Sequence, residues 1–138
     1  MSTITRFGIS MESKLLERFD RLIAEQGYSN RSEAFRDLVR ERLVKEEWKE
    51  EGIETVGTIT IIYDHHKREL MENLTKRQHK HHQSVISMMH VHLDHHNCLE
   101  VLAVKGEARE IKKIADDLIS TKGVKHGKLV MTSTGKNL

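Results

Sequence analysis

Three residues in the second half of the chain have the types and the spacing of a metal site. His90 and His92 are two apart in a segment that reads as a strand, so both imidazoles project from the same face. Cys98 follows a short turn, where the next strand of a hairpin would begin. Two imidazoles and one thiolate can bind one metal ion and leave a coordination position open.

The surroundings of these residues decide between a metal site and a solvated hairpin. A lone His-x-His pair is more often an ordinary surface feature. Here all ten histidines of the chain lie at or after His65, and seven of them lie between His79 and His96. Together with Cys98 across the turn, this clustering favours metal binding.

The fourth ligand is expected from the helix that precedes the hairpin, which carries His79, His81 and His82. Any of the three could complete the site, either within one chain or across a subunit interface. The ligand types leave the metal open, because imidazole and thiolate together suit zinc, copper and nickel. Tetrahedral geometry would favour zinc, and square-planar geometry would favour nickel(II) or copper(II).

Carboxylates at three other positions have two interpretations each. Glu100 should share the face of Cys98, where it could accept the second ring N–H of a ligating imidazole, or it could be an exposed strand carboxylate. Glu33 and Asp37 are one helical turn apart and could hold potassium, magnesium or calcium. A solvated ionic face is the favoured interpretation of that pair, because arginines lie nearby.

Length and charge bound the possible functions. The 138 residues suffice for one ordinary domain or two small ones, and the single cysteine excludes an intrachain disulfide. A net charge of +2 does not indicate nucleic-acid binding, so any DNA-binding function must rest on architecture. No apolar run reaches the ~18 residues of a membrane span, and the start lacks a signal peptide. We expect a cytoplasmic protein with no membrane association.

The first fifty residues are patterned as one strand and two helices. Residues 6–11 alternate between polar and apolar, as a strand with one solvated face does. Ser13 is placed to cap a first helix that ends at Gly27. Asn30 and Glu33 resemble the capping box of a second helix.

Two copies of this segment would cover each other's open strand edge and apolar face, so residues 1–49 are predicted to be an obligate dimer. Residues 50–54 are the predicted linker. Residues 55–138 follow the order β-α-β-β-α-β, which is the ferredoxin-like arrangement. The predicted fold class is therefore α+β, with a second domain whose open sheet face needs a partner. Its elements are expected at residues 55–63, 67–82, 85–93, 98–104, 107–120 and 128–133.

These patterns resemble one protein family, the nickel-responsive ribbon-helix-helix repressors of the NikR type, over nearly the whole chain. Residues 27–34 resemble the turn and second-helix start of its DNA-binding domain. Four further segments are similar to motifs of its ACT-type sensor domain: Gln78-His79, His90-Val91-His92, Asn97-Cys98-Leu99-Glu100 and residues 123–127.

The resemblance implies a square-planar nickel(II) site, one per subunit, bound by His90, His92 and Cys98 of one subunit and by His79 of another. It also implies a homotetramer, built as a dimer of dimers around the sensor domains. The remaining histidines of this region exceed the family pattern and could form weaker sites: His65, His66, His81, His82, His95 and His96.

The resemblance assigns contacts to double-stranded operator DNA as well. Arg6, Gly8 and Ser10 correspond to ribbon positions that read bases in the major groove. Family members usually carry a hydroxyl residue at the middle position, so Gly8 is a departure that could change the preferred operator. Contacts to the DNA backbone, which add affinity with little sequence information, are implied for Asn30, Arg31, Ser32, Lys67 and Arg68.

By this resemblance the chain is a nickel-dependent repressor of nickel uptake or nickel-utilisation genes, and not an enzyme. Nickel would order the segment from His65 to His82 and so raise the affinity for operator DNA. A metal-dependent enzyme is the first rival, but no His-Glu-x-x-His or other catalytic motif is present. A metal buffer is the second rival, and it leaves the ribbon and its two helices without a purpose.

Overall fold

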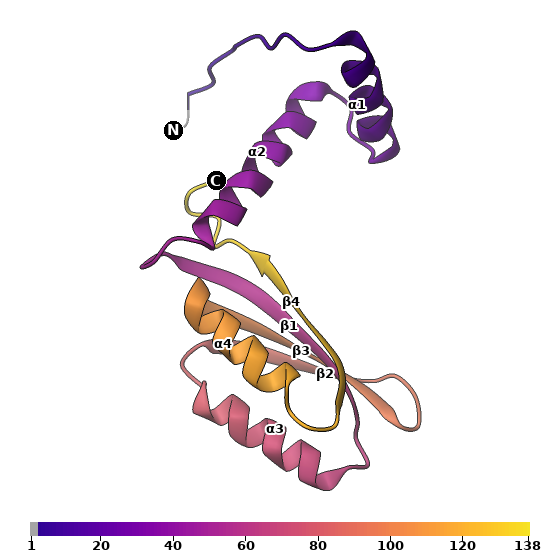
Figure 1. Ribbon diagram of the computed structural model, residues 1–138, viewed down its shortest axis with the longest axis vertical. Coiled ribbons are helices and arrows are strands. Elements are labelled where there is room, and N and C mark those ends of the chain that lie inside the picture. The colour runs from indigo at the N-terminus through magenta and orange to yellow at the C-terminus, as the bar shows by residue number, and fades with distance from the viewer. Residues whose placement is uncertain (1–2) are drawn as a thin grey trace. The chain divides into compact units, whose positions relative to one another are not determined.

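The computed structural model describes residues 3–138 and divides into two compact units between Glu41 and Arg42 (Figure 1). Trp48 belongs to the second unit, where its indole N–H donates to the carbonyl of Thr132 at 2.8 Å. The predicted linker at residues 50–54 therefore lies inside that unit. The two helices in the first half of the chain are α1 (Ser13–Glu25) and α2 (Arg31–Glu47), and α2 crosses the division.

The helix ends of the first unit follow the sequence in part. Gly27, with a φ of 86°, ends α1 in the predicted left-handed turn. The prediction that Ser13 caps α1 is wrong, because Glu12 is the N-cap residue and Ser13 is already helical. Asn30 caps α2 as predicted, since its Oδ1 accepts the backbone N–H of Glu33 at 2.9 Å.

The N-terminal segment forms no strand within one chain over residues 3–11. Phe7 makes an edge contact with Phe35, with ring centres 5.9 Å apart, yet 70% of Phe7 and 87% of Ile4 remain exposed. A single extended segment has no neighbour to accept its hydrogen bonds. The strand predicted at residues 6–11 is thus not formed within one chain, and its pairing with a second copy stays a prediction.

The second unit confirms the predicted ferredoxin-like order. Its four strands form one antiparallel sheet in the order β2-β3-β1-β4 (Figure 1). The elements are β1 (Glu54–Asp64), α3 (Arg68–Lys80), β2 (Val85–His92), β3 (Asn97–Glu107), α4 (Ala108–Ile119) and β4 (Val124–Thr132).

Strand β4 begins at Val124, four residues earlier than predicted. The prediction started too late because Gly127 interrupts the apolar pattern of the sequence. The structure explains the glycine. A Cβ at this position would lie only 2.5 Å from a side-chain carbon of Ile119, where the end of α4 packs against the strand. Gly127 thus permits the close approach of helix and sheet.

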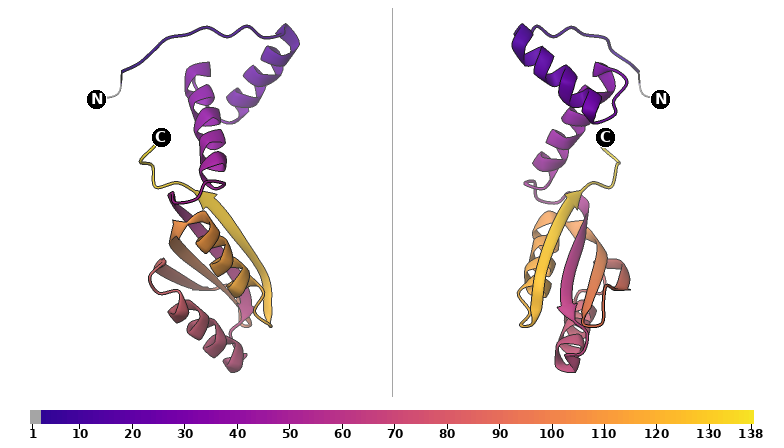
Figure 2. Two further views of the ribbon diagram at one scale, coloured as in Figure 1. Left: turned by 60° about the vertical axis from the view of Figure 1, so that its left-hand side comes forward. Right: turned by 90° about the vertical axis from the view of Figure 1, so that its right-hand side faces the viewer.

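One continuous core joins the sheet to both helices, which places α3 and α4 on the same face (Figures 1 and 2). Alternate residues of β1 point into this core, as the period of a strand requires. The opposite face carries half-buried Thr58, Thr60 and Ile62, and no helix or strand within residues 3–138 covers it. No helix in residues 3–138 is both long and apolar enough to cross a membrane. The largest fully buried side chains of the core include Ile59, Ile61, Tyr63, Leu74, Leu102, Ile111, Ile114 and Leu118.

Candidate metal centre

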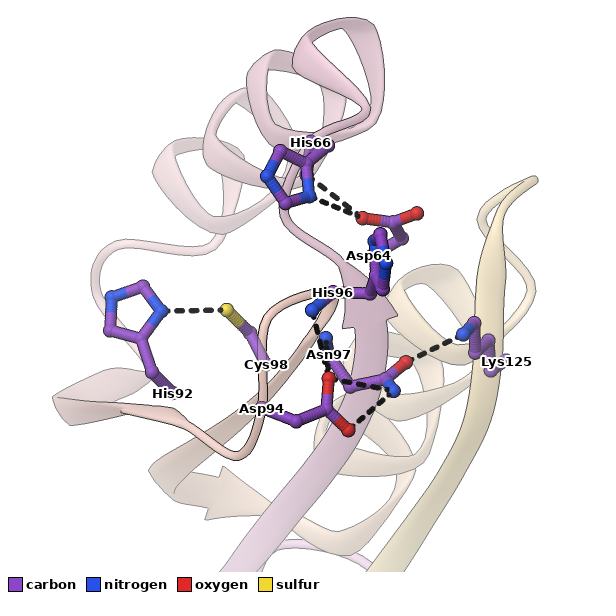
Figure 3. Close-up of polar contacts among 8 residues, drawn as sticks. All are labelled: Asp64, His66, His92, Asp94, His96, Asn97, Cys98 and Lys125. Carbon is purple, nitrogen blue, oxygen red and sulfur yellow. Dashed lines mark hydrogen bonds and ion pairs between the residues drawn. The ribbon is translucent and has the colours of Figure 1, made fainter.

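The hairpin of β2 and β3 brings together the three residues that the spacing singled out. His92 lies directly across from Cys98, and His90 lies across from Glu100. Residues opposite each other in an antiparallel pair share a face, so all four side chains point to the side of the sheet that the helices cover. The Sγ of Cys98 is 3.4 Å from the Nδ1 of His92 (Figure 3). The ring centres of His90 and His92 are 5.1 Å apart.

These separations fit a metal site. Two donors that bind one first-row metal ion at right angles, with bond lengths of roughly 2.0–2.3 Å, lie about 3 Å apart. The 3.4 Å between Cys98 Sγ and His92 Nδ1 is close to that value. The pair therefore needs little movement to share an ion, and His90 extends the donor set along the same strand.

Cys98 is fully buried, whereas His92 is exposed. Burial raises the pKa of the Cys98 thiol, and the nearby carboxylate of Glu100 raises it further. The free thiol is therefore protonated at neutral pH, and a metal ion that binds the thiolate must displace that proton.

Glu100 connects the site to α3. Its carboxylate is buried and accepts the side-chain amide of Gln78 at 3.1 Å, while its other oxygen lies 3.6 Å from the Nδ1 of His90. The hydroxyl of Tyr63 lies 3.5 Å from the same His90 nitrogen. Burial, and then the charge of Glu100, raises the pKa of Tyr63, which keeps its hydroxyl neutral. Polar groups from β1 and β3 thus surround the Nδ1 of His90.

His79 does not join the donors of its own chain. It lies exposed near the end of α3. The residue that the structure places beside His92 and Cys98 is instead His65, and donor atoms of these three residues lie within 4.8 Å of one another. Sequence reasoning gave His65 only a minor role, because its approach depends on the pairing of the end of β1 (Tyr63) with Cys98 at the start of β3.

The predicted base-reading residues Arg6, Gly8 and Ser10 all lie in the exposed N-terminal segment. A Cβ built at Gly8 meets nothing within 4 Å, so the single chain does not require glycine there. Gly8 also has no positive φ, so its backbone conformation does not require glycine. The fold of one chain therefore does not explain why glycine occupies this position.

The predicted DNA-backbone contacts lie at two helix starts. Asn30, Arg31 and Ser32 surround the N-terminus of α2, an end of a helix that attracts phosphate through its positive dipole. Lys67 is the N-cap residue of α3 and Arg68 is its first residue, with 92% of the arginine side chain exposed. Each group can therefore meet a phosphate without rearrangement of its own helix.

Two of the predicted functional side chains of the first unit are already paired. Arg31 makes a two-pronged ion pair with Asp20, with both N–O distances at 2.8 Å. Asp37 accepts the hydroxyl of Tyr28 at 2.6 Å and a hydrogen bond from Arg40 at 3.0 Å. These partners lower the pKa of Asp37 and match the ionic face that the sequence favoured at this position.

Comparison with known proteins assigns the chain to a family. Residues 56–132 match the model of the NikR C terminal nickel binding domain, and residues 5–46 match the model of the ribbon-helix-helix proteins of the CopG family. The chain belongs to the NikR family. Its hairpin with His90, His92 and Cys98 lies within the segment that matches the nickel binding domain of NikR proteins.

Several relatives match this chain over nearly its whole length. A protein of Geobacter sulfurreducens is 63% identical over 138 residues, covering 100% of this chain and 99% of its own. One from Caldanaerobacter subterraneus is 61% identical over 135 residues, covering 98% and 88%, and one from Solibacter usitatus is 54% identical over 138 residues, covering 100% and 99%. Each of these proteins is provisionally named a nickel-responsive regulator.

A solved structure shows the fold alone. The uncharacterized protein TM1266 from Thermotoga maritima superposes with a TM-score of 0.53 at 13% identity, covering 59% of this chain and 100% of its own. The family matches confirm the predicted α+β fold class and the regulator family, and with it the prediction that the protein is a DNA-binding regulator and not an enzyme.

Proposed function

We propose that this NikR protein is a nickel-dependent repressor of nickel uptake or nickel-utilisation genes in the cytoplasm. The observation that carries the proposal is the position of Cys98 Sγ 3.4 Å from His92 Nδ1, on a hairpin within the matched nickel binding domain. The ribbon-helix-helix match over residues 5–46 supplies the DNA-binding half of the function.

The proposed nickel site contains His90, His92 and Cys98 of one subunit and His79 of the partner subunit, with one ion per subunit. His79 is exposed and lies outside the donor group of its own chain, as a ligand offered to another chain would. A tetramer built on the sheet face around Thr58, Thr60 and Ile62, which no layer covers within one chain, would bring the two chains together.

The structure also supplies a second candidate for the completing ligand. His65 already lies with His92 and Cys98 inside one chain, and its Nδ1 is buried without a hydrogen-bond partner. A buried ring nitrogen without a partner is a plausible ligand atom. The within-chain set of His65, His92 and Cys98 therefore competes with the intersubunit set.

Ligand binding would reach the DNA-binding residues through α3. A bound nickel ion would join the hairpin to a helix of the partner subunit and favour the ordered state of that helix. Within each chain, Gln78 of α3 already donates to Glu100 beside His90, so the helix and the site share one contact. Lys67 and Arg68 at the start of α3 would then meet phosphates, while Arg6, Gly8 and Ser10 read bases.

The hard-cation site at Glu33 and Asp37 remains a separate proposal. Potassium or a related ion would need to compete with Tyr28 and Arg40 for Asp37, and with the hydroxyl of Ser29, which donates to Glu33 at 3.2 Å. Carboxylates held this way are more often ionic surface pairs than cation sites.

The test uses three variants of the full-length protein: Cys98→Ala, His79→Ala and His65→Ala. The intersubunit site predicts that the first two lose the thiolate-to-nickel charge-transfer band and nickel-dependent operator binding, while His65→Ala keeps both. Loss of the band in His65→Ala, with an intact band in His79→Ala, would assign the site to one chain.

Mixed tetramers sharpen this test. If His79 acts across subunits, a mixture of the Cys98→Ala and His79→Ala chains contains some interfaces with every ligand intact, and part of the band returns. Operator binding is measured on the promoter DNA of the protein's own gene, with and without nickel. Full nickel loading without any metal-dependent DNA binding would contradict the repressor and support a metal buffer.

A further inference from the structure

The strand that carries His90 and His92 lies at an edge of the sheet. Within residues 3–138, β2 pairs with one strand, β3, in the order β2-β3-β1-β4. Their pairing is irregular between Val85 and Ser87, at the end of β2 that lies away from the turn. A slip of one residue would move the side chains of β2 to the other face of the sheet, away from Cys98. The turn between β2 and β3 is therefore the place where the register of the proposed ligands can be fixed.

The side chain of Asp94 organises this turn (Figure 3). Its carboxylate accepts the backbone N–H groups of His96 and Asn97, each at 2.8 Å. The backbone N–H of Leu93 donates to the carbonyl of Asn97 at 2.9 Å, next to the last paired residues of the two strands. A carboxylate that accepts the N–H groups two and three residues ahead holds the backbone in a defined turn.

The side chain of Asn97 links the turn to β4. Its Nδ2 donates to both carboxylate oxygens of Asp94, at 2.9 and 3.2 Å. Its Oδ1 accepts a hydrogen bond from the ammonium group of Lys125 at 2.5 Å (Figure 3). Lys125 lies near the start of β4, on the far side of β1 in the sheet order. Because Asn97 directly precedes Cys98 in β3, these contacts also fix the backbone from which the thiol projects.

We propose that Asp94, Asn97 and Lys125 are positioning residues for the proposed nickel site, and we call them the register lock. They act through the backbone of the hairpin, by holding β2 in the register that sets His92 across from Cys98. This role rests on the proposed function, in which those two residues bind nickel. It also gives a purpose to Lys125 of residues 123–127, a segment that the sequence singled out and that the proposed ligand set does not use.

The register lock should change the strength of nickel binding and not the identity of the ligands. Ligands that are held in place before the ion arrives need not be ordered at the moment of binding. Without the lock every donor is still present, but the donors occupy several arrangements. The nickel affinity should therefore fall, while the complex formed at saturating nickel stays the same.

The experiment titrates the full-length protein with nickel(II) against a competing chelator and records the thiolate charge-transfer band. Asp94→Ala should lower the nickel affinity by about 10–100-fold, as loss of groups that orient metal ligands does, and should keep the full band at saturating nickel. Asp94→Asn should lose less, because an asparagine can still accept the two backbone N–H groups. Cys98→Ala is the reference for a lost ligand, since it should have no band at any nickel concentration.

The contribution of β4 is measured with a matched pair of lysines. Lys125→Ala should lower the nickel affinity, though less than Asp94→Ala does, and Lys125→Arg should restore it because arginine can also donate to Asn97. Lys122→Ala removes the same charge from an exposed position just before β4 and should leave the affinity unchanged.

Amide hydrogen exchange of the nickel-free protein reads the register without the ion. The N–H of Leu93 should exchange faster in Asp94→Ala, while exchange in β1 should not change. A nickel affinity that Asp94→Ala leaves unchanged would overturn the register lock, even if the exchange rate rises.

If Asp94→Ala also speeds exchange in β1, the lysine variants decide instead, and equal affinities of Lys125→Ala and Lys122→Ala would overturn the lock. The failure of the proposed function looks different. An unsubstituted protein without a thiolate band would refute the nickel site and the lock together, whereas a band of unchanged affinity in every lock variant would refute the lock alone.

Discussion

The two units of the chain differ in how much core one copy can build. In the second unit, side chains such as Ile59, Leu102 and Ile114 have no exposed surface. In the first, Leu22 and Leu38 keep 50% and 54% of their surface exposed, and both line a hollow of about 270 Å³ between α1 and α2. The second unit builds a buried core from its own contacts, whereas the first leaves apolar side chains exposed, and we predict that a second chain covers them.

Removal of a core side chain from the second unit should have the largest effect on stability. Leu102→Ala leaves a cavity in a fully buried position, and such substitutions cost about 2–5 kcal/mol of unfolding free energy. Denaturant unfolding followed by the fluorescence of Trp48, the single tryptophan, measures this unit directly. Leu138→Ala, at a 46% exposed position, is the control and should change little. Equal losses for the two variants would mean that this core does not stabilise the unit.

The same kind of truncation in the first unit tests the missing layer. Leu38→Ala should cost little if Leu38 stays as exposed as it is in one chain, but about 1.5–3 kcal/mol if a second copy buries it. We expect the larger loss, seen as faster amide hydrogen exchange in α1 and α2 and unchanged exchange in the β-sheet. An unchanged exchange rate in both helices would show that the first unit needs no partner.

Local patterns were sufficient for the elements that one chain completes. The sequence predicted a strand at residues 55–63, which is β1, and the spacing of His90, His92 and Cys98 placed three side chains close together because a strand and a hairpin are local structures. The predicted strand at residues 6–11 is not formed in one chain, because no neighbouring segment of that chain accepts its hydrogen bonds, and we predict that a second copy supplies the partner strand.

The part of the site that the sequence could not predict depends on the register between β1 and β3. His65 approaches Cys98 only because Tyr63 pairs with Cys98 across two strands that are far apart in sequence. The spacing of histidines carries no information about that pairing. The turn of β2 and β3 was visible in the sequence, but its contact with the end of β1 was not.

The two sets of DNA-binding residues should differ in kind. Arg6→Ala removes a side chain assigned to base reading, and loss of such a contact costs about 1–3 kcal/mol of operator affinity. Binding to random DNA and to nickel should change little. Lys67→Ala with Arg68→Ala should instead weaken binding to operator and random DNA alike. The slope of the logarithm of the binding constant against the logarithm of the salt concentration should become shallower by about 2. Operator affinity that survives in Arg6→Ala would remove this residue from base reading.

The smallest expected effect concerns the ion pair of Arg31 and Asp20. This arginine is assigned to the DNA backbone, yet in the free chain two of its three donor nitrogens, Nε and Nη2, are held by the Asp20 carboxylate. The pair is exposed and adds little stability, so Asp20→Asn should leave the unfolding free energy almost unchanged. It should release the guanidinium for phosphate, because the competing carboxylate is gone. Binding to random DNA should then strengthen, and the slope of the logarithm of the binding constant against the logarithm of the salt concentration should become steeper by up to about 1.

Glu17→Gln is the control, because it removes one acidic charge from the same helix without releasing Arg31 and so separates this release from a general change in charge. If Asp20→Asn weakens binding instead, the carboxylate positions Arg31 for phosphate and does not compete with it.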